Sequence, residues 1–432
     1  MPSEIKTSEV DATAQPPKGA LRTFLGSIGP GVITGAADDD PSGIATYSVA
    51  GAQLGTGLLW TALITWPLMA AVQIMCARIG MVTGRGLAAS ISQKFPRIVV
   101  NLCVGALLIA NTINIGSDLA GMAEAAAMLS GFNSHIYVIV FAIGISWATV
   151  KLRYYQIAAT LKWLCLTLFA YVIAAFALHP HWRSVAHAAL VPSWPHGKEA
   201  WGLLVAILGT TISPYLFFWQ AAQEVEEEKA SGRNTIAKRR GATVVELRTR
   251  IIDVGMGTFF SNLVMFFIIL TTALTLHQHG LTKIETAGDA AQALRPLAGP
   301  FAATLFTVGI LGVGFLAIPT LTGSAAYAFA DSFKWRQGLD KPLRQARSFY
   351  TVILLSTAAA VAIDFARISP VKALYWTAVI NGLLAPFLLV AILWVASDKK
   401  LMQNQPSSLL ARLVVGFTTL VMFAAGIAMF VV

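Results

Sequence analysis

The chain has 432 residues, of which 56% are hydrophobic and only 12% are charged. Soluble globular proteins carry roughly 25% charged residues, so this composition excludes a soluble globular protein and requires contact with lipid. The formal net charge of +10 would suit a nucleic-acid partner, but the distribution of basic residues along the chain explains it better as membrane topology.

The first 24 residues are polar and of mixed charge, without the basic-then-apolar pattern of a signal peptide. We expect them to form a disordered cytoplasmic tail. From residue 25 onwards, apolar segments recur evenly, and many approach the roughly 20 residues that cross a bilayer. Because backbone groups in lipid must pair within their own segment, these spans are predicted to be helices. The eleven expected spans are residues 26–51, 58–80, 98–130, 136–151, 157–178, 200–224, 253–276, 299–330, 348–363, 372–396 and 409–432.

The basic residues divide unequally between the two sides of the predicted membrane domain. With the N-terminus inside, 24 of the 31 lysines and arginines fall in cytoplasmic segments, and the densest group lies between the sixth and seventh spans. Cytoplasmic loops of membrane proteins carry this excess of positive charge. The sequence therefore predicts a multi-pass protein of the cell membrane with a cytoplasmic N-terminus and an external C-terminus.

Two of the expected spans are interrupted by polar residues and a proline. The first contains DDDPSG at residues 38–43, and the sixth contains GTTISP at residues 209–214. Proline removes a backbone donor and clashes with the preceding turn, so each segment is predicted to break its helix. Unpaired backbone groups at membrane depth are tolerated only where they line a cavity inside the protein.

The two predicted breaks lie five spans apart, which is the spacing expected of an inverted-repeat transporter. In such proteins the substrate binds near the bilayer midplane, between the two broken helices. We therefore expect one transporter domain over residues 25–432. It would consist of a first repeat at about 25–180, a second at about 198–400 and an extra helix at about 408–432.

Asp40 is the strongest candidate site residue. A carboxylate at mid-membrane costs at least about 2.5 kcal/mol on insertion scales, and the first span contains no lysine or arginine. A bound cation is therefore the natural partner, and the break also offers partly negative carbonyls. The neighbouring Asp38 and Asp39 either cap or solvate an external vestibule, or belong to the ion pathway, for which Asp39 is the candidate.

The break in the sixth span offers the opposite wall of this site. The carbonyl of Thr210 is a hard oxygen ligand, and the Ser213 hydroxyl could bind a cation directly or hold a water molecule. The alternative is that Thr211 and Ser213 bond only to their own backbone, as such residues commonly do in membrane helices.

Other polar positions follow helical spacing in the remaining spans. Asn111, Asn114 and Asp118 share one face of the third span and either join helices or line a wet path. Asn381 is a polar candidate in the tenth span. Glu224 lies ten residues past the sixth-span proline, about 15 Å along a helix, where it either lines an inner exit funnel or is a solvated helix end.

The sequence carries no nucleotide-binding or catalytic signature. GxxxxGK[ST], HExxH and a Ser/His/Asp arrangement are all absent. We therefore expect a carrier rather than an enzyme, with no cofactor and no ATP-derived energy within this chain.

Five features of the chain resemble the natural resistance-associated macrophage protein (Nramp) family of divalent metal transporters. DPSG at residues 40–43 is similar to the family's Asp-Pro-Gly-Asn motif, and residues 77–85 resemble the end of its second helix. Residues 118–120 fit its third helix, Pro214 fits the break in its sixth, and residues 397–402 fit the end of its tenth. The resemblance implies an all-α membrane protein of the amino-acid–sodium symporter fold, with five plus five inverted helices and broken helices 1 and 6.

The resemblance also implies site residues. It carries the family's aspartate ligand onto Asp40 and a backbone carbonyl ligand of helix 6 onto Thr210. The transported substrate would then be a divalent metal ion held between helices 1 and 6, in a protein surrounded by lipid. We expect a monomer.

This chain departs from the family pattern at five positions. Gly43 stands where the family has its asparagine ligand, Ser213 where it has methionine, and Tyr215 where it has histidine. Gly121 replaces an acidic residue of helix 3, and Asn381 is the nearest counterpart of the helix 10 glutamine. Thioethers favour softer transition metals, so these changes predict a roomier, harder site for partly hydrated Mg²⁺ or for Mn²⁺. The chain resembles the magnesium-type branch related to Nramp.

The leading hypothesis is a secondary transporter of Mg²⁺ or Mn²⁺ that works by alternating access, with Asp40 as its central ligand. Loss of the histidine and of the helix 3 acid leaves Asp118 as the candidate proton relay, with Tyr215 and Glu224 as further pathway candidates. Two alternatives remain open: a proton-coupled Fe²⁺/Mn²⁺ symporter like the main family, and an organic-solute symporter on the same fold.

Overall fold

The computed structural model describes residues 34–35, 37–152, 166–194, 196–365 and 369–431. Over these residues every regular element is a helix, and nine helical segments within them are long and apolar enough to cross a membrane. The prediction of an all-α membrane protein is therefore confirmed. The tail expected at residues 1–24 and the start of the fifth span lie outside the described residues.

The helices follow the expected spans closely. The long ones are α4 (Trp60–Thr83), α6 (Arg97–Ser130), α7 (Ser134–Lys151), α14 (Val244–Thr275), α17 (Ala302–Phe333), α18 (Arg347–Asp364), α19 (Pro370–Ser397) and α20 (Leu409–Val431). The first span is represented by α3 (Pro41–Leu54), the fifth by α9 (Phe169–Ala177), and the sixth by α11 (Lys198–Thr211) followed by α12 (Pro214–Ala230). Short helices occupy the connections: α5 (Leu87–Ile91), α10 (Trp182–Leu190), α13 (Ile236–Arg239), α15 (Ala287–Ala291) and α16 (Arg295–Ala298).

The seventh span begins nine residues earlier than the expected residue 253. Thr243 caps α14 in a capping box, in which its side chain accepts from the Glu246 amide and the Glu246 carboxylate accepts from the Thr243 amide. Such a box satisfies two amides at a helix start. The helix therefore extends through a charged segment that the count of apolar residues excluded.

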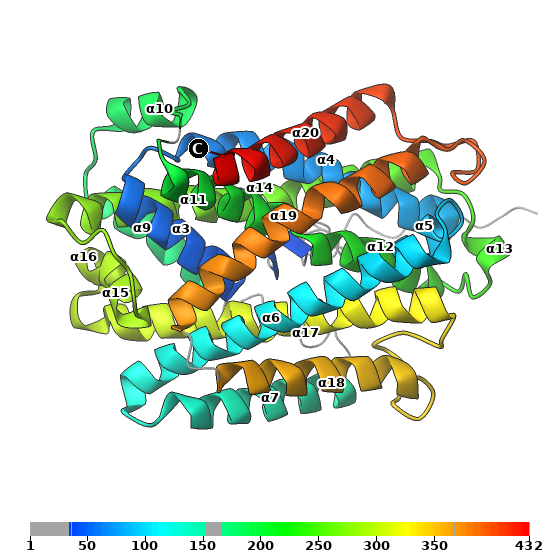
Figure 1. Cartoon of the computed structure of the whole chain (residues 1–432), viewed down its shortest axis with the longest axis horizontal. Coiled ribbons are helices and arrows are strands. Elements are labelled where there is room, and N and C mark those ends of the chain that lie inside the picture. The colour runs from blue at the N-terminus through cyan, green and yellow to red at the C-terminus, as the bar shows by residue number, and fades with distance from the viewer. Residues whose placement is uncertain (1–33, 36, 153–165, 195, 366–368, 432) are drawn as a thin grey trace, which may run out of the picture.

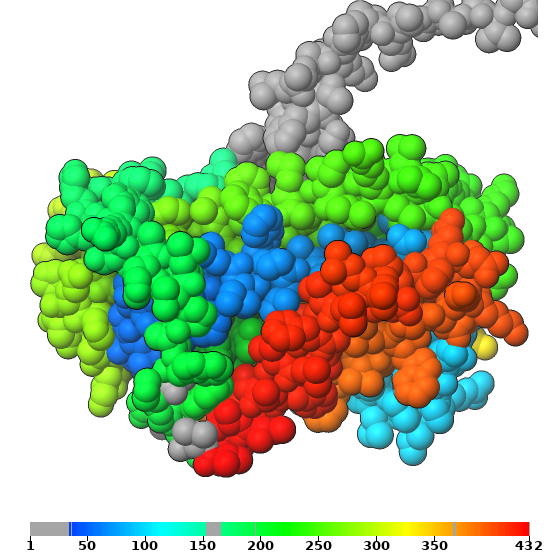
Figure 2. Space-filling view, turned by 90° about the horizontal axis from the view of Figure 1, so that it is seen from above, coloured from blue at the N-terminus to red at the C-terminus, as the bar shows by residue number. Residues whose placement is uncertain are grey.

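The elements are arranged in layers around the two predicted breaks. Figure 1 shows α3, α11 and α12 in the middle of the molecule, with α6 and α17 crossing beside them and α7 and α18 paired as an outer layer. On the opposite side, α20 lies across the surface against α19 (Figure 2). The breaks are consequently enclosed by helices on several sides.

Small residues let the central helices approach closely. Gly209 on α11 faces α19, where a Cβ would come within 2.6 Å of the Gly382 Cα and closer still to neighbouring backbone atoms. Close backbone contact of this kind replaces the hydrophobic drive that is absent between helices in lipid. Large apolar side chains on α7 and α20 are instead exposed, among them Ile143, Trp147 and Phe417, as expected for surfaces that face lipid.

Candidate functional site

Asp40 defines the break in the first span. It is the N-cap of α3, where its Oδ1 accepts a hydrogen bond of 2.7 Å from the Gly43 amide, and Pro41 occupies the first helical position, where the missing N–H costs nothing. The second oxygen, Oδ2, accepts from the Asn114 side-chain amide at 3.2 Å. Asp40 is only 2% exposed, so the cap lies inside the protein.

The break in the sixth span is held by Ser213. Helix α11 ends at Thr211 and α12 begins at Pro214. The Ser213 hydroxyl lies 2.6 Å from the Thr210 carbonyl and 2.8 Å from the Gly209 carbonyl, and donates its proton there. The alternative interpretation, bonding to the local backbone, therefore describes Ser213. Because the proton is used inside the break, the lone pairs of the hydroxyl oxygen remain available to a cation.

Two contacts bring the breaks together. The Tyr215 hydroxyl donates a 3.0 Å hydrogen bond to the Ala37 carbonyl, at the end of the helical turn that precedes the first break. A Cβ placed on Gly43 would lie 3.1 Å from Thr210 Oγ1 and 3.4 Å from Tyr47 Cε2. Thr210 therefore lies directly beside Gly43, and the expectation of a roomier site stays a prediction.

Asp38 and Asp39 are buried against α14. The Ser261 hydroxyl lies 2.6 Å from Asp38 Oδ2 and 3.1 Å from Asp39 Oδ1. Both aspartates are at most 4% exposed, so the interpretation that they cap or solvate an external vestibule is wrong. The sequence analysis missed Ser261, because nothing in the local sequence of α14 signals a partner more than 220 residues away.

The polar face of α6 divides into two parts. Asn111 donates to the Leu321 carbonyl at 2.8 Å and to Ser324 Oγ at 2.9 Å, so it joins α6 to α17. Asn114 donates a hydrogen bond to Asp40 instead. Asp118 is fully buried, and neither of its carboxylate oxygens has a hydrogen bond within the part of the chain that the structure describes. Asn114 was recognised only as part of a polar stripe and was not predicted as a site residue.

Asn381 and Glu224 have different surroundings. Asn381 is buried on α19, and its amide oxygen has no hydrogen-bond partner among the described residues. Glu224 is 1% exposed, and its carboxylate lies 2.7 Å from Gln220 Nε2 and 2.8 Å from Arg250 Nε. The interpretation of Glu224 as a solvated helix end is therefore wrong, because α14 covers it with an arginine. Its role in an exit pathway stays a prediction.

The site is rich in oxygen and carries negative charge. Asp38, Asp39, Asp40 and Asp118 are all buried, and each carboxylate would be costly to bury without a cation or a proton. Within the described residues, no group of three or more His, Cys, Asp or Glu side chains is placed to cage a metal ion. A cation held here would therefore need backbone carbonyls, hydroxyls, amides or water as further ligands, which are the ligands of hard cations.

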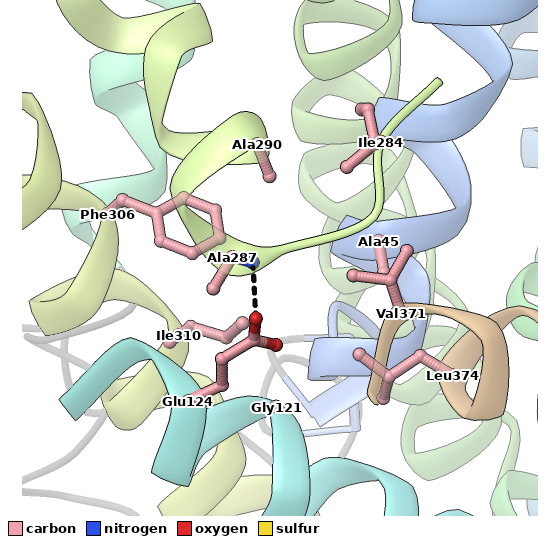
Figure 3. Close-up of a pocket in the computed structure, with 10 residues that line it drawn as sticks. All are labelled: Ala45, Gly121, Glu124, Ile284, Ala287, Ala290, Phe306, Ile310, Val371 and Leu374. Atoms are coloured by element: carbon pink, nitrogen blue, oxygen red, sulfur yellow. Dashed lines mark hydrogen bonds between the residues drawn. The ribbon is translucent and has the colours of Figure 1, made fainter. Parts of the chain in front are cut away.

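A small cavity lies beside the site, bordered by α3, α6, α15, α17 and α19. Its volume is about 20 Å³, enough for about one water molecule. Figure 3 shows apolar side chains around it and one carboxylate, Glu124, which accepts a 3.2 Å hydrogen bond from the Ala287 amide. Gly121 and Leu374 form one wall, and a Cβ on Gly121 would lie 3.0 Å from Leu374 Cδ1.

Comparison with known families gives a match over nearly the whole chain. Residues 31–432 match the model of the natural resistance-associated macrophage protein-like family. Among curated proteins, the chain is 26% identical over 413 residues to the divalent metal cation transporter MntH of Bacillus subtilis, covering 91% of each chain. It is also 26% identical over 407 residues to MntH of Caldanaerobacter subterraneus, covering 91% of this chain and 90% of that protein.

Solved structures share the same fold. The chain is similar to the manganese transporter of Eremococcus coleocola, whose crystal structure holds an aromatic bis-isothiourea substituted compound. The TM-score is 0.72 and the identity 19%, and the match covers 98% of this chain and 90% of that one. It is more distantly similar to Mhp1, a nucleobase-cation-symport-1 family transporter, with a TM-score of 0.54 and 15% identity over 93% and 90% of the two chains. At these identities the likeness establishes the architecture alone.

Proposed function

The chain belongs to the natural resistance-associated macrophage protein (Nramp) family, and from that premise we propose that it carries Mg²⁺ or Mn²⁺ with Asp40 as the central ligand. The coarser statement follows from the family itself: the chain is a membrane transporter of divalent metal cations, not an enzyme. The family implies no cofactor, because the metal is the cargo.

The observation that carries the proposal is the position of Asp40. Its carboxylate is buried between two helix breaks, and its hydrogen-bond donors, the Gly43 amide and the Asn114 side chain, are both neutral. Among the described residues, no lysine, arginine or histidine forms an ion pair with it. A divalent cation bound at this carboxylate would supply the missing charge.

The chemistry of the surrounding atoms favours a hard ion. The Thr210 carbonyl and the Ser213 hydroxyl are oxygen donors, and the position at which the family carries a thioether is Ser213 in this chain. Soft ligands select transition metals, whereas carboxylate, carbonyl and water suit Mg²⁺ and Mn²⁺. Since Gly43 has no side chain to offer as a ligand, we propose that waters retained by the ion complete its coordination, as Mg²⁺ prefers. We therefore propose that the chain belongs to a magnesium-type branch of the family.

Alternating access is the proposed mechanism. Asp40, Thr210, Ser213 and Asn381 are each at most 3% exposed, which is consistent with a conformation closed on both sides. We propose that the two repeats, at about 25–180 and 198–400, rock around this site. The N-terminus would lie in the cytoplasm, the C-terminus and helix α20 would end outside, and one chain would suffice for transport.

The test is uptake of Mg²⁺ and Mn²⁺ into proteoliposomes by Asp40→Asn and Asp40→Ala variants. We expect both to lose uptake while retaining the thermal unfolding profile of a folded protein in detergent. Glu285→Gln is the matched control, because Glu285 is an exposed acid in an external connection, and it should transport normally. Full uptake by Asp40→Ala would exclude Asp40 as the central ligand.

A pH-sensitive dye in the vesicle lumen separates this proposal from proton symport. Metal uptake that acidifies the lumen would favour the proton-coupled Fe²⁺/Mn²⁺ symporter, and metal uptake without proton movement would exclude it. Competition by organic solutes without metal dependence would instead indicate the organic-solute symporter.

A further inference from the structure

The inner face of α6 carries buried oxygen atoms that no described residue pairs with. Asn114 Oδ1 and both carboxylate oxygens of Asp118 have no hydrogen-bond partner among the described residues. Both side chains are completely buried. Leaving a buried acceptor without a partner costs about 1–3 kcal/mol, and more when the group is charged. Three such atoms on one helix face therefore require a partner that the described residues do not provide.

The neighbouring polar residues of α6 direct their hydrogen bonds to other helices. Asn111 donates to the Leu321 carbonyl and to Ser324 Oγ, and Ser117 lies 3.0 Å from Thr377 Oγ1. These contacts join α6 to α17 and α19. Asn111 Oδ1 and Glu124 Oε2 also lack a partner among the described residues, so Asn114 and Asp118 are distinguished by their position beside the break of the first span.

Both side chains converge on that break. Residues four apart on a helix lie on the same face, and Asn114 and Asp118 have this spacing. Asn114 Nδ2 donates to Asp40 Oδ2 at 3.2 Å, so its oxygen, on the same planar amide, is close to the Asp40 carboxylate. Asp118 lies close enough to the first-span break to be repelled by the Asp40 carboxylate and stabilised by the Ser42 amide, although neither of its oxygens meets the geometry of a hydrogen bond.

We propose that α6 supplies two ligands to the transported cation, the side-chain oxygen of Asn114 and the carboxylate of Asp118. This inference rests on the proposed function and extends its ligand set. Asp40 and Asp118 together balance a double positive charge. Asn114 contributes the amide oxygen that Gly43 does not provide. This oxygen binds the cation while the NH₂ group of the same side chain continues to orient Asp40. The set then contains only hard oxygen ligands, which suit Mg²⁺ and Mn²⁺.

Equilibrium binding of Mg²⁺ and of Mn²⁺ to the full-length protein in detergent tests the assignment. We expect Asn114→Ala and Asp118→Asn each to weaken binding at least about 10-fold, a loss of the size typical when groups that shape a metal site are removed. Asn111→Ala is the matched control, because it removes the same kind of side chain from the same helix. It should leave metal affinity unchanged even if it lowers thermal stability.

The number of water ligands on bound Mn²⁺ provides a readout that a purely structural role would not change. Electron spin-echo modulation in D₂O counts exchangeable waters, and the Asn114→Ala and Asp118→Ala proteins should each gain a water ligand relative to the wild type and to Asn111→Ala. If Asn114→Ala does not fold, Asn114→Asp retains an oxygen at the position. It should bind Mn²⁺ at least as tightly as the wild type, with no added water.

Each contrary result has a defined meaning. Unchanged affinity in Asp118→Asn and an unchanged water count in Asp118→Ala, with lost proton movement, would make Asp118 a proton relay and overturn its assignment as a ligand. Unchanged affinity in Asn114→Ala would remove Asn114 from the ligand set. Failure of the proposed function is distinguishable, because Asp40→Asn would then bind metal as well as the wild type does.

Discussion

Replacing Gly43 by alanine probes the contact between the two breaks. The new Cβ would lie 3.1 Å from Thr210 Oγ1, 3.4 Å from Tyr47 Cε2 and 3.5 Å from the Asp38 carbonyl oxygen. Only the first distance is well below an ordinary van der Waals separation of about 3.5 Å or more. The threonine side chain must therefore give way by a few tenths of an ångström, and the backbone of the sixth-span break is the structure most directly affected.

Two opposing effects set how much Gly43→Ala changes the free energy of unfolding. Overpacking of a buried position typically costs about 1–3 kcal/mol. Alanine in place of glycine within the first turn of α3 gains up to about 1 kcal/mol of helix propensity. The net loss of stability is then about 0–2 kcal/mol, small enough for a folded protein. Transport should fall much further, because a shift of Thr210 displaces the carbonyl that we propose as a ligand.

A double-mutant cycle with Thr210→Ala measures this coupling. Thr210→Ala removes Oγ1 but retains the main-chain carbonyl, so on its own it should keep most metal affinity and uptake. In that background Gly43→Ala should become nearly harmless, which yields a positive coupling between the two changes. Mg²⁺ binding, proteoliposome uptake and thermal unfolding are measured for all four proteins. Wild-type binding and uptake by Gly43→Ala alone would refute the view that this contact sets the geometry of the site.

Three further predictions concern stability, each measured as thermal unfolding of the purified protein. Arg250→Ala should lower the free energy of unfolding by about 3–5 kcal/mol, because it leaves the buried Glu224 carboxylate without its cation. Adding Glu224→Gln should restore part of that loss. Unchanged stability of the single variant would contradict the prediction. Gly51→Ala should destabilise the protein by about 1–3 kcal/mol or prevent expression. The new Cβ would overlap a threonine hydroxyl and a backbone carbonyl of α14. A normal unfolding temperature would show that α3 and α14 can separate freely. The ion pair with Lys94 lowers the pKa of Asp398, so its small stabilisation is complete above about pH 4 and is lost as the pH falls through the lowered pKa. Asp398→Asn should therefore be slightly less stable than the wild type at pH 7 and equal to it in strong acid, and a difference that grows on acidification would reverse the sign.

The elements of the fold were predictable because their signals are local. Proline beside polar residues inside an apolar run marked both breaks, and the structure ends α11 before Pro214 and starts α3 at Pro41. The early start of α14 also had a local signal, Thr243 followed three residues later by Glu246, which is a capping box at sequence level. Apolar length alone placed the start of the span at residue 253, which is too late for the helix.

The partners of the buried acids were not predictable, because they are set by packing between distant helices. Ser261 reaches Asp38 and Asp39 across 222–223 positions of the chain, and Arg250 reaches back to Glu224 from the next helix. A polar residue in an apolar span signals that it needs a partner, but not which partner. The same limit applies to Gly43, because only the fold shows that Thr210 lies beside it.

The division of labour within the site follows from its hydrogen bonds. The breaks are stabilised by the chain's own side chains: Asp40 accepts from the Gly43 amide, Ser213 donates to the Thr210 carbonyl, and Tyr215 donates to Ala37. The backbone of the site is therefore preorganised without an ion. Buried side-chain oxygens without a partner among the described residues gather on α6, at Asn111, Asn114, Asp118 and Glu124. A bound cation would then stabilise the protein by neutralising buried carboxylates, not by folding the breaks. This favours a doubly charged ion over a neutral solute at the same position.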